Sequence, residues 1–133
     1  MFLPDTKQES IFDEIKPFVQ TALDGMNVCI FAYGQTGSGK TFTMEGPSID
    51  DDCMNGSFTD INMKPVKKSG ILPRVACLLQ KEMNRYQKYG QPLSIQVSAL
   101  EIYCENIRDL LSKRMEATYL DLRSIGNKVN CVG

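Results

Sequence analysis

A glycine-rich segment stands between an apolar run and the start of a predicted helix, and it limits the chain to few folds. Residues 34–41 read Gly-Gln-Thr-Gly-Ser-Gly-Lys-Thr and fit the pattern G-x-x-x-x-G-K-[ST]. Val28–Tyr33, directly before it, has no polar alternation, which predicts a parallel strand covered on both faces. A helix is expected to begin near Gly39. Strand, loop and helix in this order are the context that a phosphate-binding loop requires.

Each residue type in this loop has a physical task. Glycines let the backbone wrap closely, so that consecutive N–H groups form a nest for an anion, and the helix N-terminus adds positive charge. Lys40 is expected to reach the β- and γ-phosphates of a nucleotide, and the Thr41 hydroxyl to ligate Mg²⁺. The candidate nucleotide-binding residues are Gly34, Gln35, Thr36, Gly37, Ser38, Gly39, Lys40, Thr41 and Phe42. The pattern alone selects neither ATP over GTP nor a motor over a small-molecule kinase.

The absence of histidine excludes several kinds of site at once. Ser-His and Cys-His nucleophile pairs, histidine-ligated metals and imidazole pH switches all need this side chain. Any catalysis must therefore use carboxylates, lysine, hydroxyls or a bound metal ion. The 15 basic and 16 acidic residues nearly balance, so no overall field attracts the chain to nucleic acid or to an anionic membrane.

Cysteine usage and the N-terminus indicate the cellular location. Five cysteines without a C-x-x-C pair are typical of a reducing compartment, and we expect them to be buried free thiols. The first residues lack the basic and apolar regions of a secretory signal, and no apolar run approaches the ~20 residues of a membrane span. We therefore expect a soluble chain of the cytoplasm, with neither nucleic acid nor membrane as a partner.

Periodic apolar residues predict two helices. Ile11–Leu23 has the spacing of one helix face, with Ser10 or Thr6 as the N-terminal cap and Gly25 as the stop. Gly70–Gly90 has a second apolar stripe, with a proline suitably placed in its first turn.

The second half of the chain predicts mainly strands. Leu93–Tyr103 is expected to form a long strand, Asn106–Leu111 a short helix, and Tyr119–Gly133 a hairpin with its turn at Gly126 and Asn127. Helices alternating with strands indicate an α/β fold with a largely parallel sheet.

Residues 45–70 have little apolar periodicity and predict a long, solvated surface loop. Three adjacent aspartates, Asp50, Asp51 and Asp52, lie within it. Because adjacent carboxylates lack the spacing of a calcium loop, a divalent metal site there is the weaker interpretation.

The segment from Asp24 to Gly46 strongly resembles the ATP-binding segment of the kinesin motor domain. Three further matches follow in the family's order: Gly70-Ile71-Leu72-Pro73-Arg74, then Glu101-Ile102-Tyr103 with Glu105, Asp109, Leu110 and Leu111, then Leu122-Arg123 with Val132-Gly133. The resemblance spans nearly the whole chain. The residues of the first segment are more similar to those of the C-terminal-motor, minus-end-directed kinesins.

The resemblance implies a kinesin-type fold of the P-loop nucleoside triphosphate hydrolases, with ATP or ADP and Mg²⁺ as cofactors and microtubules as the partner. Residues 45–70 correspond to a variable loop beside the nucleotide pocket, and residues 111–133 to a lobe that lies toward the microtubule. Lys113, Arg114 and Arg123 are candidate contacts with the acidic tubulin surface. The family's activity implies Mg·ATP hydrolysis coupled to movement along microtubules of the cytoskeleton.

The sequence also departs from the family pattern. Met26 stands where the family often has tyrosine near the adenine, and Cys104 replaces the asparagine of E-I-Y-N-E. Glu101 and Tyr103 of that motif are expected to be architectural. The first strand with R-x-R-P and the segments N-x-x-S-S-R-S-H and D-L-A-G-S-E have no match in residues 1–133, which predicts an incomplete motor domain.

The unmatched segments sense the γ-phosphate and position the attacking water, and phosphoryl transfer depends on such positioning. We therefore expect the isolated chain to have little ATPase activity, and a stalk outside it to make the parent protein dimeric. Two alternatives stay open. One is a catalytically silent module that binds tubulin or another chain. The other is an unrelated small P-loop enzyme, for which the sequence supplies no acceptor site.

Overall fold

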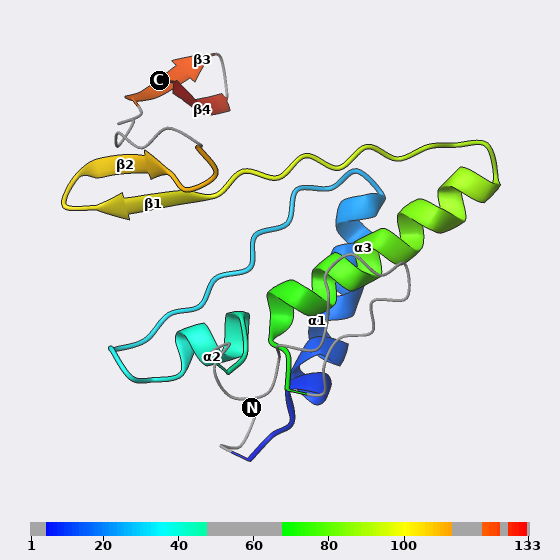
Figure 1. The fold of residues 1–133 in the computed structure, drawn as a ribbon, viewed down its shortest axis with the longest axis horizontal. Helices are drawn as coiled ribbons and strands as arrows, with labels where there is room; N and C mark the ends of the chain where they lie inside the picture. Colours follow the sequence, from blue (N-terminus) through cyan, green and yellow to red (C-terminus); the bar gives the residue numbers. More distant parts are fainter. Residues whose placement is uncertain (1–4, 48–67, 113–120, 126–127, 133) are drawn as a thin grey trace. The chain divides into compact units, whose positions relative to one another are not determined.

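The computed structural model describes residues 5–47, 68–112, 121–125 and 128–132 (Figure 1). The chain divides into two compact units, Met1–Leu93 and Ser94–Gly133. The first unit contains the helices α1 (Gln8–Leu23), α2 (Lys40–Met44) and α3 (Ile71–Lys88). The second contains the strands β1 (Leu100–Tyr103), β2 (Asn106–Asp109), β3 (Asp121–Ile125) and β4 (Lys128–Val132).

Helix α1 confirms the predicted first helix and begins a turn earlier, at Gln8. Its N-cap is Lys7, whose side chain makes no capping bond, so the predicted caps Ser10 and Thr6 are wrong. The helix continues through Pro17, whose carbonyl also accepts a bond from the Thr21 hydroxyl at 3.0 Å. Gly25 follows the last turn with a φ of 93°, and its N–H donates to the Ala22 carbonyl, as predicted for a glycine stop.

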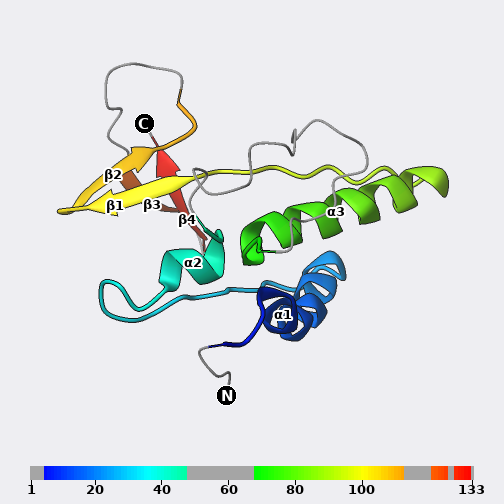
Figure 2. The same ribbon diagram turned by 60° about the horizontal axis from the view of Figure 1, so that its bottom comes forward.

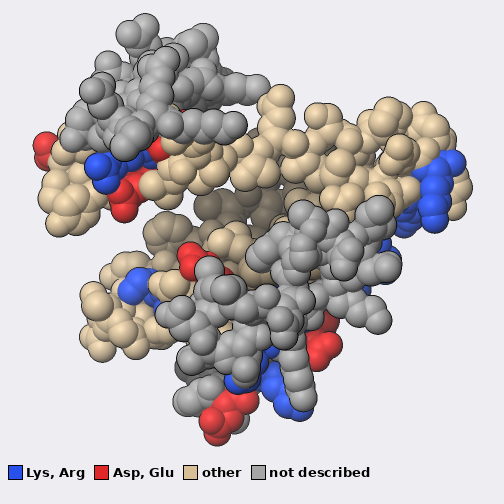
Figure 3. All heavy atoms as spheres, in the orientation of Figure 1, with Lys and Arg blue, Asp and Glu red and all other residues tan. Residues whose placement is uncertain are grey.

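Helix α3 confirms the second predicted helix, and Gly90 ends it with a φ of 74°. The exposed Arg85 pairs with the buried Glu82 of the same helix at 2.8 Å, and the Arg85 guanidinium lies 5.4 Å from the centre of the Tyr86 ring. The face drawn in Figure 3 carries basic side chains at the last turn of α3, where Arg85 and Lys88 lie.

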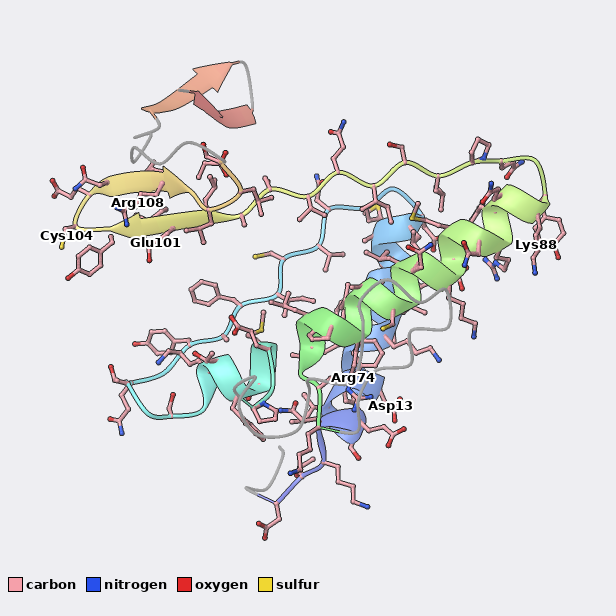
Figure 4. The ribbon with its side chains drawn as sticks, in the orientation of Figure 1. Asp13, Arg74, Lys88, Glu101, Cys104 and Arg108 are labelled. Carbon is pink, nitrogen blue, oxygen red and sulfur yellow. The ribbon has the colours of Figure 1, made fainter. Side chains whose placement is uncertain are left out.

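Helices α1 and α3 pack side by side in the first unit (Figures 1 and 2). Val19 of α1 and Ile71 of α3 are 6% and 5% exposed. Arg74 (labelled in Figure 4) is also buried, and its Nε donates to the Ser69 carbonyl at 2.9 Å, which satisfies part of its hydrogen-bonding capacity. The sequence predicted an apolar face on each of these helices, and the burial of the Arg74 side chain was not expected.

The predicted strand Val28–Tyr33 is an extended segment that pairs with no strand of the described residues. Val28, Ile30 and Ala32 are half-buried, whereas Phe31 and Tyr33 are 82% and 92% exposed. This alternation is that of a segment covered on one face, so the predicted cover on both faces is wrong for these residues. A ladder needs a neighbouring backbone, and none of the described residues provides one.

β1 and β2 form an antiparallel hairpin, with Glu101 opposite Arg108 and Tyr103 opposite Asn106. β1 confirms only the end of the predicted long strand, because residues 91–99 have no regular structure. The predicted helix over residues 106–111 is wrong. Cys104 and Glu105 both have positive φ, 48° and 65°, and this two-residue turn leads the chain back along β1.

β3 and β4 form a second antiparallel hairpin, which confirms the one predicted for the C-terminal region. Ile125 lies opposite Lys128, and the predicted turn residues 126 and 127 are outside the described residues. Both sheets of the described residues have two antiparallel strands, so the predicted parallel pairing is not found in this part of the chain.

Three cysteines of the described residues, Cys29, Cys77 and Cys104, are free thiols, as predicted. The predicted burial is wrong for Cys29 and Cys104, which are exposed. Among the helices described, none has the length and apolar character needed to cross a lipid bilayer.

Candidate phosphate-binding site

The glycine-rich loop leads directly into α2, as the sequence predicted, and all the candidate residues from Gly34 to Phe42 lie in this one stretch (Figure 1). Gly39 is the N-cap of α2 with a φ of 88°, and Gly37 has a φ of 79°. These left-handed conformations favour glycine. Within the loop, the Ser38 N–H donates to the Gln35 carbonyl at 3.2 Å, which closes a tight turn.

Lys40 folds back over the loop that precedes it. Its Nζ donates to the carbonyl oxygens of Gly34 at 2.8 Å and Gln35 at 2.7 Å. Lys40 has no acidic partner within the described residues, so carbonyl dipoles alone hold its ammonium. The positive charge therefore stays available to an anion bound in the loop.

A side chain at the first position of the loop would require the Ser38 side chain to move. A Cβ at Gly34, where φ is 156°, would lie 2.5 Å from the Ser38 Oγ. No described group accepts a bond from the backbone N–H groups of Gly37, Gly39 or Lys40. These donors, the Lys40 ammonium and the exposed Thr41 hydroxyl form a donor set that fits the phosphates of a nucleotide and its Mg²⁺.

A backbone seam, Glu45–Gly46 against Ser69–Gly70, holds the end of α2 against the start of α3. The Gly70 N–H donates to the Glu45 carbonyl at 3.0 Å, and a Cβ on Gly70 would lie 2.6 Å from the Glu45 nitrogen. A Cβ on Gly46 would lie 3.0 Å from the Gly70 nitrogen. The seam joins the ends of residues 47–68, and the motif match at Gly70 was the only signal for it.

Gln8 was not predicted to belong to the site. It is the first residue of α1 and is 7% exposed, and its Nε2 donates to the Phe42 carbonyl of α2 at 2.6 Å. A lone glutamine at the edge of an amphipathic helix carries no sequence signal for such a contact across 34 residues.

Other candidate residues lie elsewhere. Glu101 and Arg108 face each other across the hairpin at 3.6 Å (Figure 4), and Tyr103 is 71% exposed. The expected architectural role of Glu101 and Tyr103 stays a prediction. The aspartates 50–52 and the basic residues 113 and 114 are outside the described residues, as is the side chain of Arg123. The described residues contain no group of three His, Cys, Asp or Glu that could hold a metal ion.

Comparison with known proteins gives a consistent result. The chain matches the kinesin motor domain family model over residues 1–132. It is 45% identical to carboxy-terminal kinesin 2 of Xenopus laevis over 115 residues, covering 86% of this chain and 16% of that protein. It is 43% identical to kinesin-like protein KIN-14M of Arabidopsis thaliana over 121 residues, covering 91% and 14% respectively. It is 38% identical to protein claret segregational of Drosophila melanogaster over 130 residues, covering 98% and 16%.

Proposed function

The chain belongs to the kinesin motor domain family, whose fold is that of the P-loop nucleoside triphosphate hydrolases, and we propose that residues 34–42 bind ATP or ADP with Mg²⁺. The chain spans 14% to 16% of the length of these curated relatives. We propose that it serves as the nucleotide-binding part of a longer microtubule motor of the cytoplasmic cytoskeleton. The observation that carries the proposal is the loop geometry, above all the Lys40 ammonium folded over Gly34 and Gln35.

The residues of the loop make different contacts with the nucleotide. The backbone N–H groups of Gly37, Gly39 and Lys40 donate to phosphate oxygens, and the Lys40 ammonium neutralises their charge. The Thr41 hydroxyl is the proposed magnesium ligand. Bound Mg²⁺ supplies further neutralisation of the phosphate charge. Gly34 keeps the backbone free of a side chain where the loop folds back on Ser38.

A titration of the 133-residue chain with Mg·ADP, measured by calorimetry, tests this proposal. Lys40→Ala is expected to weaken binding by about 30- to 150-fold, since a charge-assisted contact of about 2–3 kcal/mol is lost at a site of high phosphate charge. Lys81→Ala, at an exposed position on α3, is the matched control and should bind as the original chain does. Equal affinities of the Lys40→Ala and Lys81→Ala variants would contradict the proposal.

Thr41→Ala provides a separate measurement. Because the hydroxyl is the proposed magnesium ligand, this variant should lose the Mg²⁺-dependent part of its affinity and keep the part measured in a chelator. A Thr41→Ala variant with the original dependence on Mg²⁺ would remove Thr41 from the metal site.

We propose microtubules as the partner, through Lys113, Arg114 and Arg123. These cations are suited to an acidic protein surface, and such contacts weaken as salt rises. In co-sedimentation with microtubules, a triple Glu variant at these positions should pellet less than the original chain at low salt. Equal pelleting of the two chains would exclude these residues as contacts.

A further inference from the structure

Helix α2 is too short to fix its own position. It has five residues, Lys40–Met44, and an isolated helix of this length is not stable in water. Its backbone bonds are few. The carbonyls of Gly39 and Thr41 accept from Thr43 and Glu45 at 2.8 Å each. The orientation of α2 must therefore come from the elements that surround it.

The Phe42 carbonyl is the point at which α1 holds this helix. Since α2 ends two residues later, this carbonyl belongs to the last turn, where intrahelical donors run out. No backbone N–H of the described residues reaches it, and the Gln8 Nε2 donates to it at 2.6 Å. Gln8 thus caps the end of α2 from a different helix.

The surroundings of Gln8 favour a specific role for this bond. The side chain is nearly fully buried, and its Oε1 is buried without a partner among the described residues. A buried carbonyl oxygen without a hydrogen-bond partner destabilises the fold, so an apolar residue of the same size would be more favourable for packing alone. The single hydrogen bond that the amide donates to the Phe42 carbonyl is therefore its favourable contribution at this position.

Phe42 directly follows the two residues that are proposed to contact the nucleotide. A small rotation of α2 would move the Lys40 ammonium and the Thr41 hydroxyl together, and binding of phosphates depends strongly on such placement. We propose that Gln8 is a positioning residue of the nucleotide site: its bond to the Phe42 carbonyl holds α2 so that Lys40 and Thr41 face the phosphates. The effect of Gln8 on nucleotide affinity rests on the proposed function, whereas its effect on the position of α2 rests on the hydrogen bond alone.

The test compares Gln8→Met, which keeps the size and removes the donor, with Gln20→Met. Gln20 is an exposed glutamine on the same helix, and its Nε2 bonds only Asp24 at 3.2 Å among the described residues. The first readout needs no nucleotide and is amide hydrogen exchange of the full chain, resolved into α1, α2 and α3. Gln8→Met should speed exchange in α2 about 5- to 10-fold, the size expected for one net hydrogen bond, and leave α3 unchanged.

The second readout is the affinity for Mg·ADP. Gln8→Met should weaken it by about 5- to 10-fold, and Gln20→Met should leave both readouts unchanged. Gln8→Glu, which sets a carboxylate against the Phe42 carbonyl, should weaken affinity more than Gln8→Met. Faster exchange spread equally over all three helices would make Gln8 merely structural, and unchanged exchange in α2 would overturn the inference. Failure of the original chain to bind Mg·ADP would overturn the proposed function, whereas the exchange comparison would still decide whether Gln8 holds α2.

Discussion

The helices of the first unit and the hairpins of the second differ in where their backbone groups find partners. Helices α1 and α3 bond within themselves, and Val19 and Ile71 are buried where they pack. Within the described residues, β1 and β2 pair only with each other, and Ile102 and Tyr103 are each 71% exposed. The helical unit is therefore held by side-chain packing and close backbone approach, whereas β1–β2 combines its ladder with one buried side chain, Ile107, among its described residues.

The largest expected effect is at Ile71, which is 5% exposed. Ile71→Ala should lower the free energy of unfolding of the helical unit by about 2–4 kcal/mol, because a cavity remains. The control is Leu72→Ala, at a neighbouring side chain that is 49% exposed, with an expected loss below about 1 kcal/mol. Urea unfolding followed by far-ultraviolet circular dichroism measures both.

Ile107→Ala tests the hairpin unit in the same way. Ile107 is 7% exposed in β2, and its truncation should leave the helical transition in place. A shift of that transition as large as the one caused by Ile71→Ala would show that the two compact units unfold together.

The next effect is at the seam between α2 and α3. Gly70 has an ordinary φ of −76°, so an alanine there suffers only from the clash of its Cβ with the backbone of Met44 and Glu45. Gly70→Ala should cost about 1–3 kcal/mol of stability, and Gly70→Val more. Gly25, with a φ of 93° and open space around it, is the control. At Gly25 the loss of stability comes from the positive φ of the backbone, so Gly25→Ala and Gly25→Leu should lower the free energy of unfolding equally. Equal costs of Ala and Val at Gly70 would exclude the clash as the cause.

A smaller effect, of opposite sign, is expected at the hairpin turn. Cys104 has a φ of 48°, a conformation that asparagine adopts more readily than cysteine. Cys104→Asn should stabilise the β1–β2 hairpin by about 0.5–1 kcal/mol, measured as slower amide exchange in β2. Cys104→Val should have the opposite effect, because a β-branched side chain is strained at positive φ. A stabilising valine would show that the turn does not keep this conformation.

The smallest effect is at the cross-strand ion pair. Glu101 and Arg108 are about half exposed, and their charged atoms are 3.6 Å apart. Glu101→Gln should cost at most about 0.5 kcal/mol, and the loss should shrink as salt screens the pair. A loss larger than the gain from Cys104→Asn would mean that side chains, and not the ladder, hold this hairpin.

The elements that the sequence predicted well are those whose signals are local. The helical spacing over Ile11–Leu23 and Gly70–Gly90 identified α1 and α3, because a helix face depends only on neighbours along the chain. The loop before Lys40 was predicted for the same reason. Its glycines, lysine and threonine act within eight consecutive positions of one motif.

The strands were harder to predict, because a strand depends on its partner. The apolar run Val28–Tyr33 showed its extended form but not which backbone pairs with it. The turn at Cys104 and Glu105 has neither glycine nor asparagine, so Asn106–Asp109 gave no hairpin signal and was assigned to a helix. Gln8 was missed because its bond joins residues that are far apart in the sequence.

The seam of Gly46 and Gly70 has a consequence for engineering. The backbones of these two residues are in contact, so the ends of the segment between them are held together. A change in the length of that segment should therefore leave the phosphate loop in place. Doubling the length of such a closed segment adds only about 0.6 kcal/mol to the entropic cost of joining its ends. A peptide tag or fluorescent label inserted between residues 47 and 68 would therefore report from a position one helix away from the proposed nucleotide site.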